Sequence, residues 1–482
     1  MRNGWFSTPN AKRVALGVAI AALALAFTVF KPAPTTGPYL RDFEAYWSAG
    51  VTWNSGGDPY ARAIWIAERS VPGVDAARDE LLPFIGPAAF RPLWSWLGRL
   101  PFPLASRVWA AVLIVAASTV AIGSVLLAGT ERRALTAAAS FAAIFAFAPC
   151  TSAIALGQAA IVAAAATVLA VAATQRSSLW GTGSAAFVAA LQPNLALPLA
   201  ALARDRRTIV ALGIAVCVFA AATLAFGGGI SGLAHYVHAL ARHGAAERDT
   251  VIQTTPTAIA WGFGASRSFA RVTGIAIALA ALGIALVAIR TIRFDRVEAT
   301  AFVSAALPLV SPFFHEHDFA IAFLPAIVVA RRCEGVWLAA GLAGTIAIGV
   351  DWLNFVQRPD SFAQHIAQAV ALGAAILAIA ARPTKRTAGI VAITIAAVTA
   401  IGVAAARYPA PVWPDNLPSG YRASPQADVS TQWHDEQVRS GLEQRVPAWA
   451  WLRIPALGGS VLVAFALAAH AARRPQQRPR NS

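Results

Sequence analysis

Long apolar runs alternate with short polar segments along most of the chain. The first run, Val14–Phe30, follows Lys12 and Arg13 and is long enough to cross the hydrocarbon core of a membrane. Because many more runs follow, we interpret it as an uncleaved anchor rather than a signal peptide. Further spans are predicted at 104–128, 134–149, 152–173, 208–226, 268–289, 298–313, 319–330, 335–350, 366–381, 388–406 and 454–472. The pattern therefore predicts an all-α polytopic integral membrane protein with about 12 transmembrane helices.

The segment 179–203 does not fit a simple span. It lies between two basic points, Arg176 and Arg204, and Gln192–Pro193–Asn194 interrupts it. A single crossing here would invert every later loop and move the basic cluster 382–386 to the outer side. A pair of short helices that enters and leaves on the same side avoids this conflict, and such broken helices are tolerated where protein buries them. We therefore expect a re-entrant hairpin near 179–203.

Composition and charge agree with this class. The chain is 57% hydrophobic and only 13% charged, with a mean hydropathy of +0.58, whereas soluble domains carry roughly 25% charged residues. On the topology above, the outer segments hold equal numbers of basic and acidic residues, so the whole net charge of +16 lies on the cytoplasmic side. This positive-inside pattern predicts cytoplasmic N- and C-termini in the cell inner (plasma) membrane, and no nucleic-acid partner.

The topology divides the chain into five parts. We expect an N-terminal cytoplasmic end with the first span at 1–30, and a first outer loop at 31–103 with interfacial helices. The transmembrane bundle with the hairpin covers 104–406, a further outer loop covers 407–453, and the last span with a basic cytoplasmic tail covers 454–482. Three cysteines in or beside apolar runs show no metal-ligand spacing, so we interpret them as small core residues.

Charged residues gather in the first outer loop, in "RDFEAYW". Asp42 lies shortly after the first span, where its carboxylate could act as a general base at the membrane surface. Glu44 is two residues away and would face another direction on a helix. Asp58 belongs to the turn "GGDPYA". The alternative is that Asp42 and Asp58 are only loop charges and helix caps.

A second polar cluster, "SPFFHEHDF", lies in a turn between two apolar runs. His315, His317 and Asp318 could bind a metal or pair with a phosphate. Because H-x-H alone is a weak metal signal, we favour a phosphate contact and expect no metal and no cofactor. A plain solvated turn is the remaining interpretation.

Two amides and two arginines stand in apolar or Trp-rich surroundings. Gln158 and Gln192 fall inside predicted membrane segments, where buried amides more often bridge helices than bind ligands. Arg91 lies in the Trp- and Pro-rich segment 84–103, and its planar guanidinium suits phosphate oxygens. Arg99 in the same segment is equally consistent with an interfacial anchor.

These motifs resemble glycosyltransferase family 87, a group of multi-span enzymes in the GT-C superfamily. The resemblance rests on Asp42 with Tyr46, on the turn Gly56–Tyr60, on Gly157–Gln158, and on the late Ser311–Pro312 with His317. Gln192–Pro193 stands where the family has a basic residue before proline. The chain departs from the family at "PAAFRPLW", at His315 and at Asp318.

The resemblance implies a GT-C-like fold and an inverting transfer of a sugar, mannose favoured, from a polyprenyl-phosphate donor on the outer side of the membrane. The acceptor would be an envelope glycan or glycolipid, and membrane lipids would surround the enzyme. Asp42 would be the general base. The implied substrate- and phosphate-binding residues are Arg91, His317, His315, Tyr46, Asp58, Tyr60, Gln158 and Gln192.

Two other classes remain open at this point. A transporter or flippase of a lipid-linked sugar would also use a broken hairpin, but no inverted repeat of hydropathy is found. A non-catalytic assembly protein would have dispensable outer loops. The sequence contains no phosphate-binding P-loop, no dinucleotide fingerprint and no nucleophile elbow.

Overall fold

The computed structural model describes residues 38–129 and 133–474 and is built from helices, with no strand among them. The predicted first span, Val14–Phe30, and most of the basic tail lie outside the described residues. The helices of the bundle are α5 (Phe102–Ala128), α6 (Arg133–Ala146), α7 (Ala148–Leu156), α8 (Ala160–Gln175), α9 (Leu179–Ala189), α10 (Pro193–Ala196), α11 (Arg206–Gly227), α14 (Arg267–Thr291), α15 (Arg296–Val310), α16 (Phe323–Arg332), α17 (Gly335–Gly349), α19 (Phe362–Ile379), α20 (Lys385–Ala405) and α22 (Pro447–Ala472).

Seven of the described helices are long and apolar enough to cross a membrane, or eight if the bent pair α6 and α7 counts as one span. The pair bends by 63° at Phe147. The predicted spans at 152–173, 298–313 and 319–330 correspond to the shorter helices α8, α15 and α16. The structure therefore confirms an all-helical, multi-span protein, whereas the count of about 12 stays a prediction.

Polar residues at the loop ends start the long helices. The side chains of Asp205, Ser266 and Thr384 each accept a hydrogen bond from a backbone N–H three residues later. Asp295 forms a capping box with Glu298 at the start of α15. Such caps satisfy amide groups that a helix leaves free in its first turn, so the short polar loops also fix where each helix begins.

Small residues allow close helix packing in the bundle. A Cβ atom added to Gly344 of α17 would lie 2.6 Å from the backbone oxygen of Gly459 in α22, and one added to Gly459 would lie 2.5 Å from the oxygen of Gly344. The two backbones therefore touch, which is a common way to join helices in a membrane. The Ala-rich composition of the chain predicts this kind of contact.

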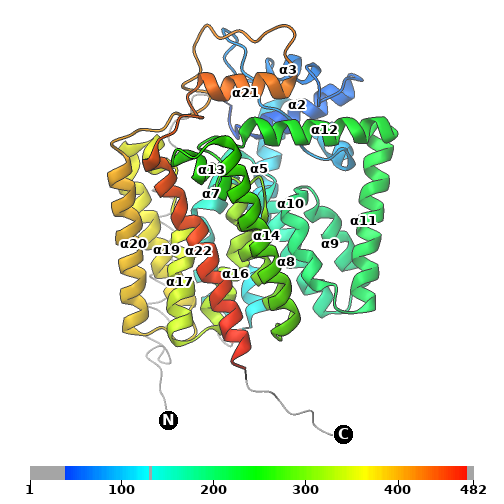
Figure 1. The fold of residues 1–482 in the computed structure, drawn as a ribbon. Coiled ribbons are helices and arrows are strands. Elements are labelled where there is room, and N and C mark those ends of the chain that lie inside the picture. The colour runs from blue at the N-terminus through cyan, green and yellow to red at the C-terminus, as the bar shows by residue number, and fades with distance from the viewer. Residues whose placement is uncertain (1–37, 130–132, 475–482) are drawn as a thin grey trace, which may run out of the picture.

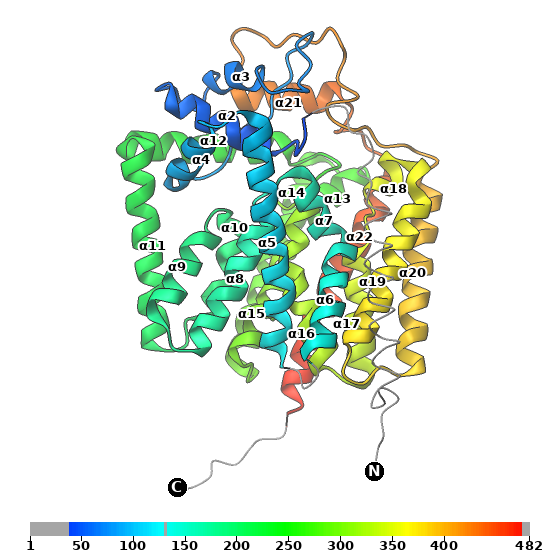
Figure 2. The same ribbon diagram turned by 180° about the vertical axis from the view of Figure 1, so that it is seen from behind.

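The expected hairpin is present as α9, a break at Gln192, and α10 followed by the 3-10 helix η2 (Leu197–Leu202). Figure 2 shows α9 and α10 beside α8 and α11. Both ends of the hairpin meet the same neighbour segment. Arg204 donates to the carbonyl oxygen of Phe294, and Arg296 bonds both Asp205, at 2.5 Å, and the carbonyl oxygen of Thr174, at 3.3 Å. The hairpin thus returns to the side from which it starts.

The predicted cytoplasmic loops meet at one end of the bundle. Arg332, at the end of α16, lies 2.5 Å from Asp295 and also donates to the carbonyl oxygen of Leu127 at 2.9 Å. Arg474 forms an ion pair with Glu298, and Arg382 with Glu334. Loops that the charge pattern assigned to one side are therefore held together by their own basic residues.

The opposite end carries the segments predicted to lie outside (Figure 1). Their helices are α2 (Phe43–Asn54), α3 (Ala63–Glu68), α4 (Arg91–Leu97), α12 (Gly229–Glu247), α13 (Pro256–Gly262), α18 (Asn354–Gln357) and α21 (Val429–Arg439), with the 3-10 helices η1 (Ala88–Phe90), η3 (His317–Ala322) and η4 (Pro359–Ser361). In Figure 1, α2, α3 and α21 lie at the top, and α12 runs across the bundle below them. These segments thus build one cap over the ends of the membrane helices.

This arrangement predicts the result of cysteine labelling in intact cells. Single cysteines placed at Ser55 in the cap and at Lys385 in a basic loop, both exposed positions, should react on opposite sides of the membrane. We expect an impermeant maleimide to label the variant at Ser55 directly, and the variant at Lys385 only after permeabilisation, because the basic loops are predicted to be cytoplasmic. Labelling of both positions from one side would contradict the topology.

Candidate functional site

A cavity of about 1200 Å³ lies where the cap meets the bundle. It is lined by the turn before α2, the segment around Phe84, the junction of α7 and α8, the hairpin break, α12, the turn 311–318, the segment 351–368 and the loop before α21. Of the predicted site residues, Asp42, Tyr46, Gln158, Gln192, His315 and His317 line it. The outer segments and the hairpin therefore converge on one space.

The turn before α2 directs Asp42 toward the cavity. Leu40 has a left-handed backbone, with φ of 57°, and the backbone N–H of Asp42 donates to the carbonyl oxygen of Leu156 at 2.8 Å. Arg41 and Phe43 on either side are buried, while Asp42 is half-buried at the cavity wall. The chain is thus anchored on both sides of the carboxylate.

Two further side chains hold the Asp42 carboxylate. The amide of Gln158 donates to Asp42 Oδ2 at 2.6 Å, and the hydroxyl of Tyr46 donates to Gln158 Oε1 at 3.0 Å. Tyr46 in turn stacks on Trp94, with ring centroids 4.6 Å apart. Burial raises the pKa of Asp42 to about 6, although the hydrogen bond from Gln158 opposes this change. A carboxylate with such a pKa is suited to accept a proton near neutral pH.

Gly157 allows the hydrogen-bonded chain of Tyr46, Gln158 and Asp42 to form. Its backbone is left-handed, with φ of 83°, and an added Cβ would lie 2.8 Å from the Cβ of Phe43. The junction of α7 and α8 can therefore approach α2 closely only with glycine at this position. The pair Gly157–Gln158 places the amide beside Asp42 for this reason.

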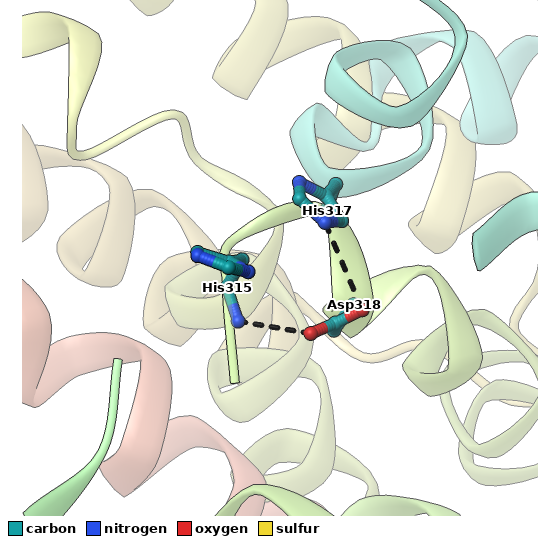
Figure 3. A group of neighbouring side chains, drawn as sticks. All are labelled: His315, His317 and Asp318. Carbon is teal, nitrogen blue, oxygen red and sulfur yellow. Dashed lines mark hydrogen bonds and ion pairs between the residues drawn. The ribbon is translucent and has the colours of Figure 1, made fainter. Parts of the chain in front are cut away.

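The turn 311–318 carries His315, His317 and Asp318 side by side (Figure 3). The backbone N–H of His315 donates to Asp318 Oδ2 at 2.9 Å, and His317 Nε2 lies 3.8 Å from Asp318 Oδ1. The two imidazoles stack with centroids 5.0 Å apart. The ligand atoms of the three residues lie within 4.8 Å of one another, so the group could hold a metal ion as well as contact an anion.

A buried carboxylate that the sequence analysis missed, Glu247, supports this turn. Glu247 Oε2 lies 2.8 Å from His315 Nε2 and accepts from Gln253 at 2.8 Å, and Oε1 accepts from the indole N–H of Trp433 at 2.7 Å. Burial by itself would raise the pKa of Glu247, but the facing His243 and His315 lower it to about 2. The only sequence signal was a cluster of charges in "RHGAAERD".

Three predicted residues lie beside the cavity rather than in its lining. Arg91 donates to the carbonyl oxygen of Phe226 at 3.1 Å. Asp58 accepts from the backbone N–H of Tyr60 at 2.9 Å and pairs with His235 at 2.8 Å. The hydroxyl of Tyr60 donates to the carbonyl oxygen of Gly86 at 2.8 Å. The contact of Tyr60 holds the segment around Phe84 in place. Arg91 bonds α11 and forms no hydrogen bond or ion pair with His315 or His317.

Other cations reach the cavity instead. Arg248, directly after α12, and Arg358, directly after α18, both line it. Neither guanidinium has an ion pair or hydrogen bond with another side chain or carbonyl among the described residues. Neither residue stands out in the sequence, because an arginine in a polar loop carries no signal of its direction.

The two sides of the cavity differ in chemistry. Tyr236, Val237 and Leu240 of α12 face it together with Phe84 and Leu191, which gives an apolar wall. The segment 351–368 contributes carboxyl, amide, hydroxyl and imidazole groups on another side. The cavity can therefore receive a ligand with an apolar and a strongly polar part.

Residues 84–312, a little under half of the chain, match the family model of glycosyltransferase family 87. The match confirms the resemblance found in the sequence, and it supports a membrane glycosyltransferase. It includes Gln158, Gln192 and Glu247 but begins after Asp42 and ends before His315. No curated protein and no solved structure matches the chain.

The ion-pair cluster at Glu247 predicts a change in stability. Glu247→Gln should lower the free energy of unfolding by about 3 kcal/mol, because it removes the charge that faces two buried histidines. Thermal unfolding of the protein in lipid nanodiscs measures the effect. Glu443→Gln is the matched control, since Glu443 pairs with the exposed side chains of Arg267 and His434 and should cost less than about 1 kcal/mol. Equal losses in the two variants would contradict the role of Glu247.

Proposed function

We propose that this membrane protein, whose residues 84–312 match glycosyltransferase family 87, transfers a sugar from a polyprenyl-phosphate donor to a glycan or glycolipid acceptor on the outer face of the plasma membrane. The single observation that carries the proposal is the Asp42 carboxylate, held by Gln158 in a cavity with one apolar and one polar wall. The family resemblance favours mannose as the sugar.

The location of the cavity supports a lipid-borne donor. It lies between the cap and the membrane helices, and Val237 and Leu240 in its apolar wall are 55% and 42% exposed. Exposed apolar side chains at the membrane boundary favour contact with hydrocarbon. A polyprenyl chain would lie along this wall, with its phosphate and sugar directed toward Asp42.

The reaction is an inverting displacement. The oxygen of an acceptor hydroxyl attacks the anomeric carbon, and the bond from that carbon to the phosphate oxygen breaks. The bonding electron pair leaves with the polyprenyl phosphate, while the hydroxyl proton passes to the Asp42 carboxylate. Asp42 is therefore the general base, and Gln158 and Tyr46 keep its carboxylate in one orientation.

The leaving phosphate needs positive charge as the bond breaks. Arg248 offers a guanidinium without a partner among the described residues, close to the apolar wall. Burial opposes the charge on His315, but Glu247 raises the pKa of His315 above its ordinary value, so this imidazole contributes a second positive charge. Burial lowers the pKa of His317 well below its ordinary value, so His317 acts as a neutral hydrogen-bonding group.

A transporter or flippase of a lipid-linked sugar is the alternative that one observation favours, because the broken hairpin reaches the cavity at Gln192. A transporter would need the hairpin to move but would not need a base. The Asp42 variant below separates the two functions.

Asp42→Asn should lower sugar transfer by about 10²–10⁴-fold, because the amide cannot accept the hydroxyl proton. Transfer by purified protein from polyprenyl-phosphate mannose or polyprenyl-phosphate arabinose to lipid acceptors measures this. Asp58→Asn is the matched control, since that carboxylate lies outside the cavity lining, and it should retain most activity. Full activity of Asp42→Asn would refute the assignment.

The pH dependence of kcat/KM gives an independent test. Activity should rise as the pH increases through about 6, the pKa of Asp42, because only the deprotonated carboxylate accepts a proton. Gln158→Leu removes a hydrogen bond that lowers this pKa, so the rise should move to higher pH. A profile without an acidic limb, or a move to lower pH, would contradict the role of Asp42.

Arg248→Gln should raise KM for the donor about tenfold, as expected for the loss of a charge-assisted contact to phosphate. Arg91→Gln is the matched control, because Arg91 already bonds Phe226 outside the cavity lining. Initial rates at varied donor concentration compare the two. A larger effect of Arg91→Gln would assign the phosphate contact to Arg91 instead.

A further inference from the structure

A second cluster of ionisable side chains lies in the same cavity, on its polar side. Glu316 shares a hydrogen bond with Asp351, and His365 Nε2 lies 3.7 Å from Asp351 Oδ2. All three residues are buried, and all three line the cavity. The reaction proposed above uses none of them.

The turn 311–318 separates this cluster from the Asp42 side. His315 faces Glu247 at the end of α12, whereas its neighbour Glu316 faces Asp351 after α17. The two adjacent side chains therefore face different parts of the cavity. We call the part bounded by Glu316, Asp351 and His365 the polar compartment.

The polar compartment offers both hydrogen-bond donors and acceptors. Gln368 donates to Thr151 Oγ1 at 3.2 Å, which fixes its amide across from α7. Ser361 Oγ lies 3.2 Å from His365 Nδ1, and both Gln368 and Ser361 line the cavity. Neighbouring groups thus hold these side chains in defined orientations.

Two carboxyl groups of the compartment form a buried pair. Glu316 Oε1 is buried and accepts from no N–H group or hydroxyl of the described residues, and the side-chain partner of Glu316 is the carboxyl group of Asp351. A buried carboxyl pair of this kind can both donate and accept hydrogen bonds when it shares a proton. Because both residues line the cavity, the pair suits a ligand that carries hydroxyl groups.

We infer that the polar compartment binds the hydroxyl groups of a saccharide, the head group of the acceptor. This inference rests on the proposed function, which requires an acceptor hydroxyl near Asp42. Carboxyl, amide, hydroxyl and imidazole groups at fixed positions suit a ligand in which each hydroxyl both donates and accepts. A hydrocarbon chain would leave these polar groups without hydrogen-bond partners, and the apolar wall at α12 already offers a place for such a chain.

Binding of small glycosides to the full-length protein in lipid nanodiscs tests the inference. The probes are methyl α-mannopyranoside and methyl α-arabinofuranoside, with cyclohexanol as a ring of similar size that lacks the hydroxyl pattern. Farnesyl phosphate reports separately on the donor side. Saturation-transfer NMR titrations give an affinity for each probe. We expect wild-type protein to bind at least one glycoside more tightly than cyclohexanol.

Two variants address the compartment directly. Glu316→Gln and His365→Gln should each weaken glycoside binding about tenfold, the size expected when one hydrogen bond to a charged or buried group is lost. Both should leave farnesyl phosphate binding within about twofold. Asp360→Asn is the matched control, because Asp360 is exposed on the same segment and does not line the cavity. Thermal unfolding checks each variant, and either folded variant suffices for the comparison.

The outcomes separate this inference from the proposed function. Two results would overturn saccharide binding in the polar compartment. One is that the glycosides bind no better than cyclohexanol, and the other is that Glu316→Gln and His365→Gln behave like Asp360→Asn. Binding of farnesyl phosphate in the same experiment would still support the lipid-phosphate donor. Glycoside binding that depends on Glu316 or His365 supports the compartment, whether or not farnesyl phosphate binds. A failure of farnesyl phosphate to bind would refute only the lipid-phosphate donor.

Discussion

The buried guanidinium of Arg41 is the interaction on which the arrangement of the cap depends. It lies 3.1 Å from Glu80 and 3.5 Å from Glu44, and it stacks over Trp413 at 4.6 Å. A guanidinium is costly to bury unless opposite charges surround it, so the three segments that supply these partners must come together. Arg41 and Asp42 both line the cavity, so the partners that fix the Arg41 side chain also fix the position of its neighbour Asp42. The fixed position of the proposed general base follows from this pair of adjacent residues.

Glu247 likewise brings several segments together, on the other side of the site. Its two oxygens contact groups from the segment after α12, from the turn 311–318 and from α21. Buried charges of this kind add little net stability, but they are satisfied in only one arrangement of the segments. The cap thus joins loops that are far apart in the sequence.

The cavity has an apolar wall and a polar compartment, and these match the two kinds of ligand proposed for it. A lipid-linked donor carries its hydrocarbon, its phosphate and its sugar in one line, and an acceptor presents hydroxyls. The apolar residues of α12 and the polar residues of 351–368 lie on different sides of the same space. Asp42 and His315 lie near enough to interact electrostatically, so the proposed proton acceptor and the proposed positive charge lie close together in the cavity.

The sequence by itself determined that the chain is helical and has several membrane spans, which of the described loops lie at the same end of the bundle, and the hairpin at 179–203. These features depend on local hydrophobicity and on charge, which act along short stretches of chain. It also singled out Asp42, Gln158 and the histidine turn, which line the cavity, because polar groups stand out against apolar surroundings. Only the tertiary structure decided that Arg91 bonds a carbonyl oxygen, that Arg248 faces the cavity, and that Glu247 and Glu316 face different partners. The direction of a loop side chain is set by contacts with distant segments, and no local pattern encodes them.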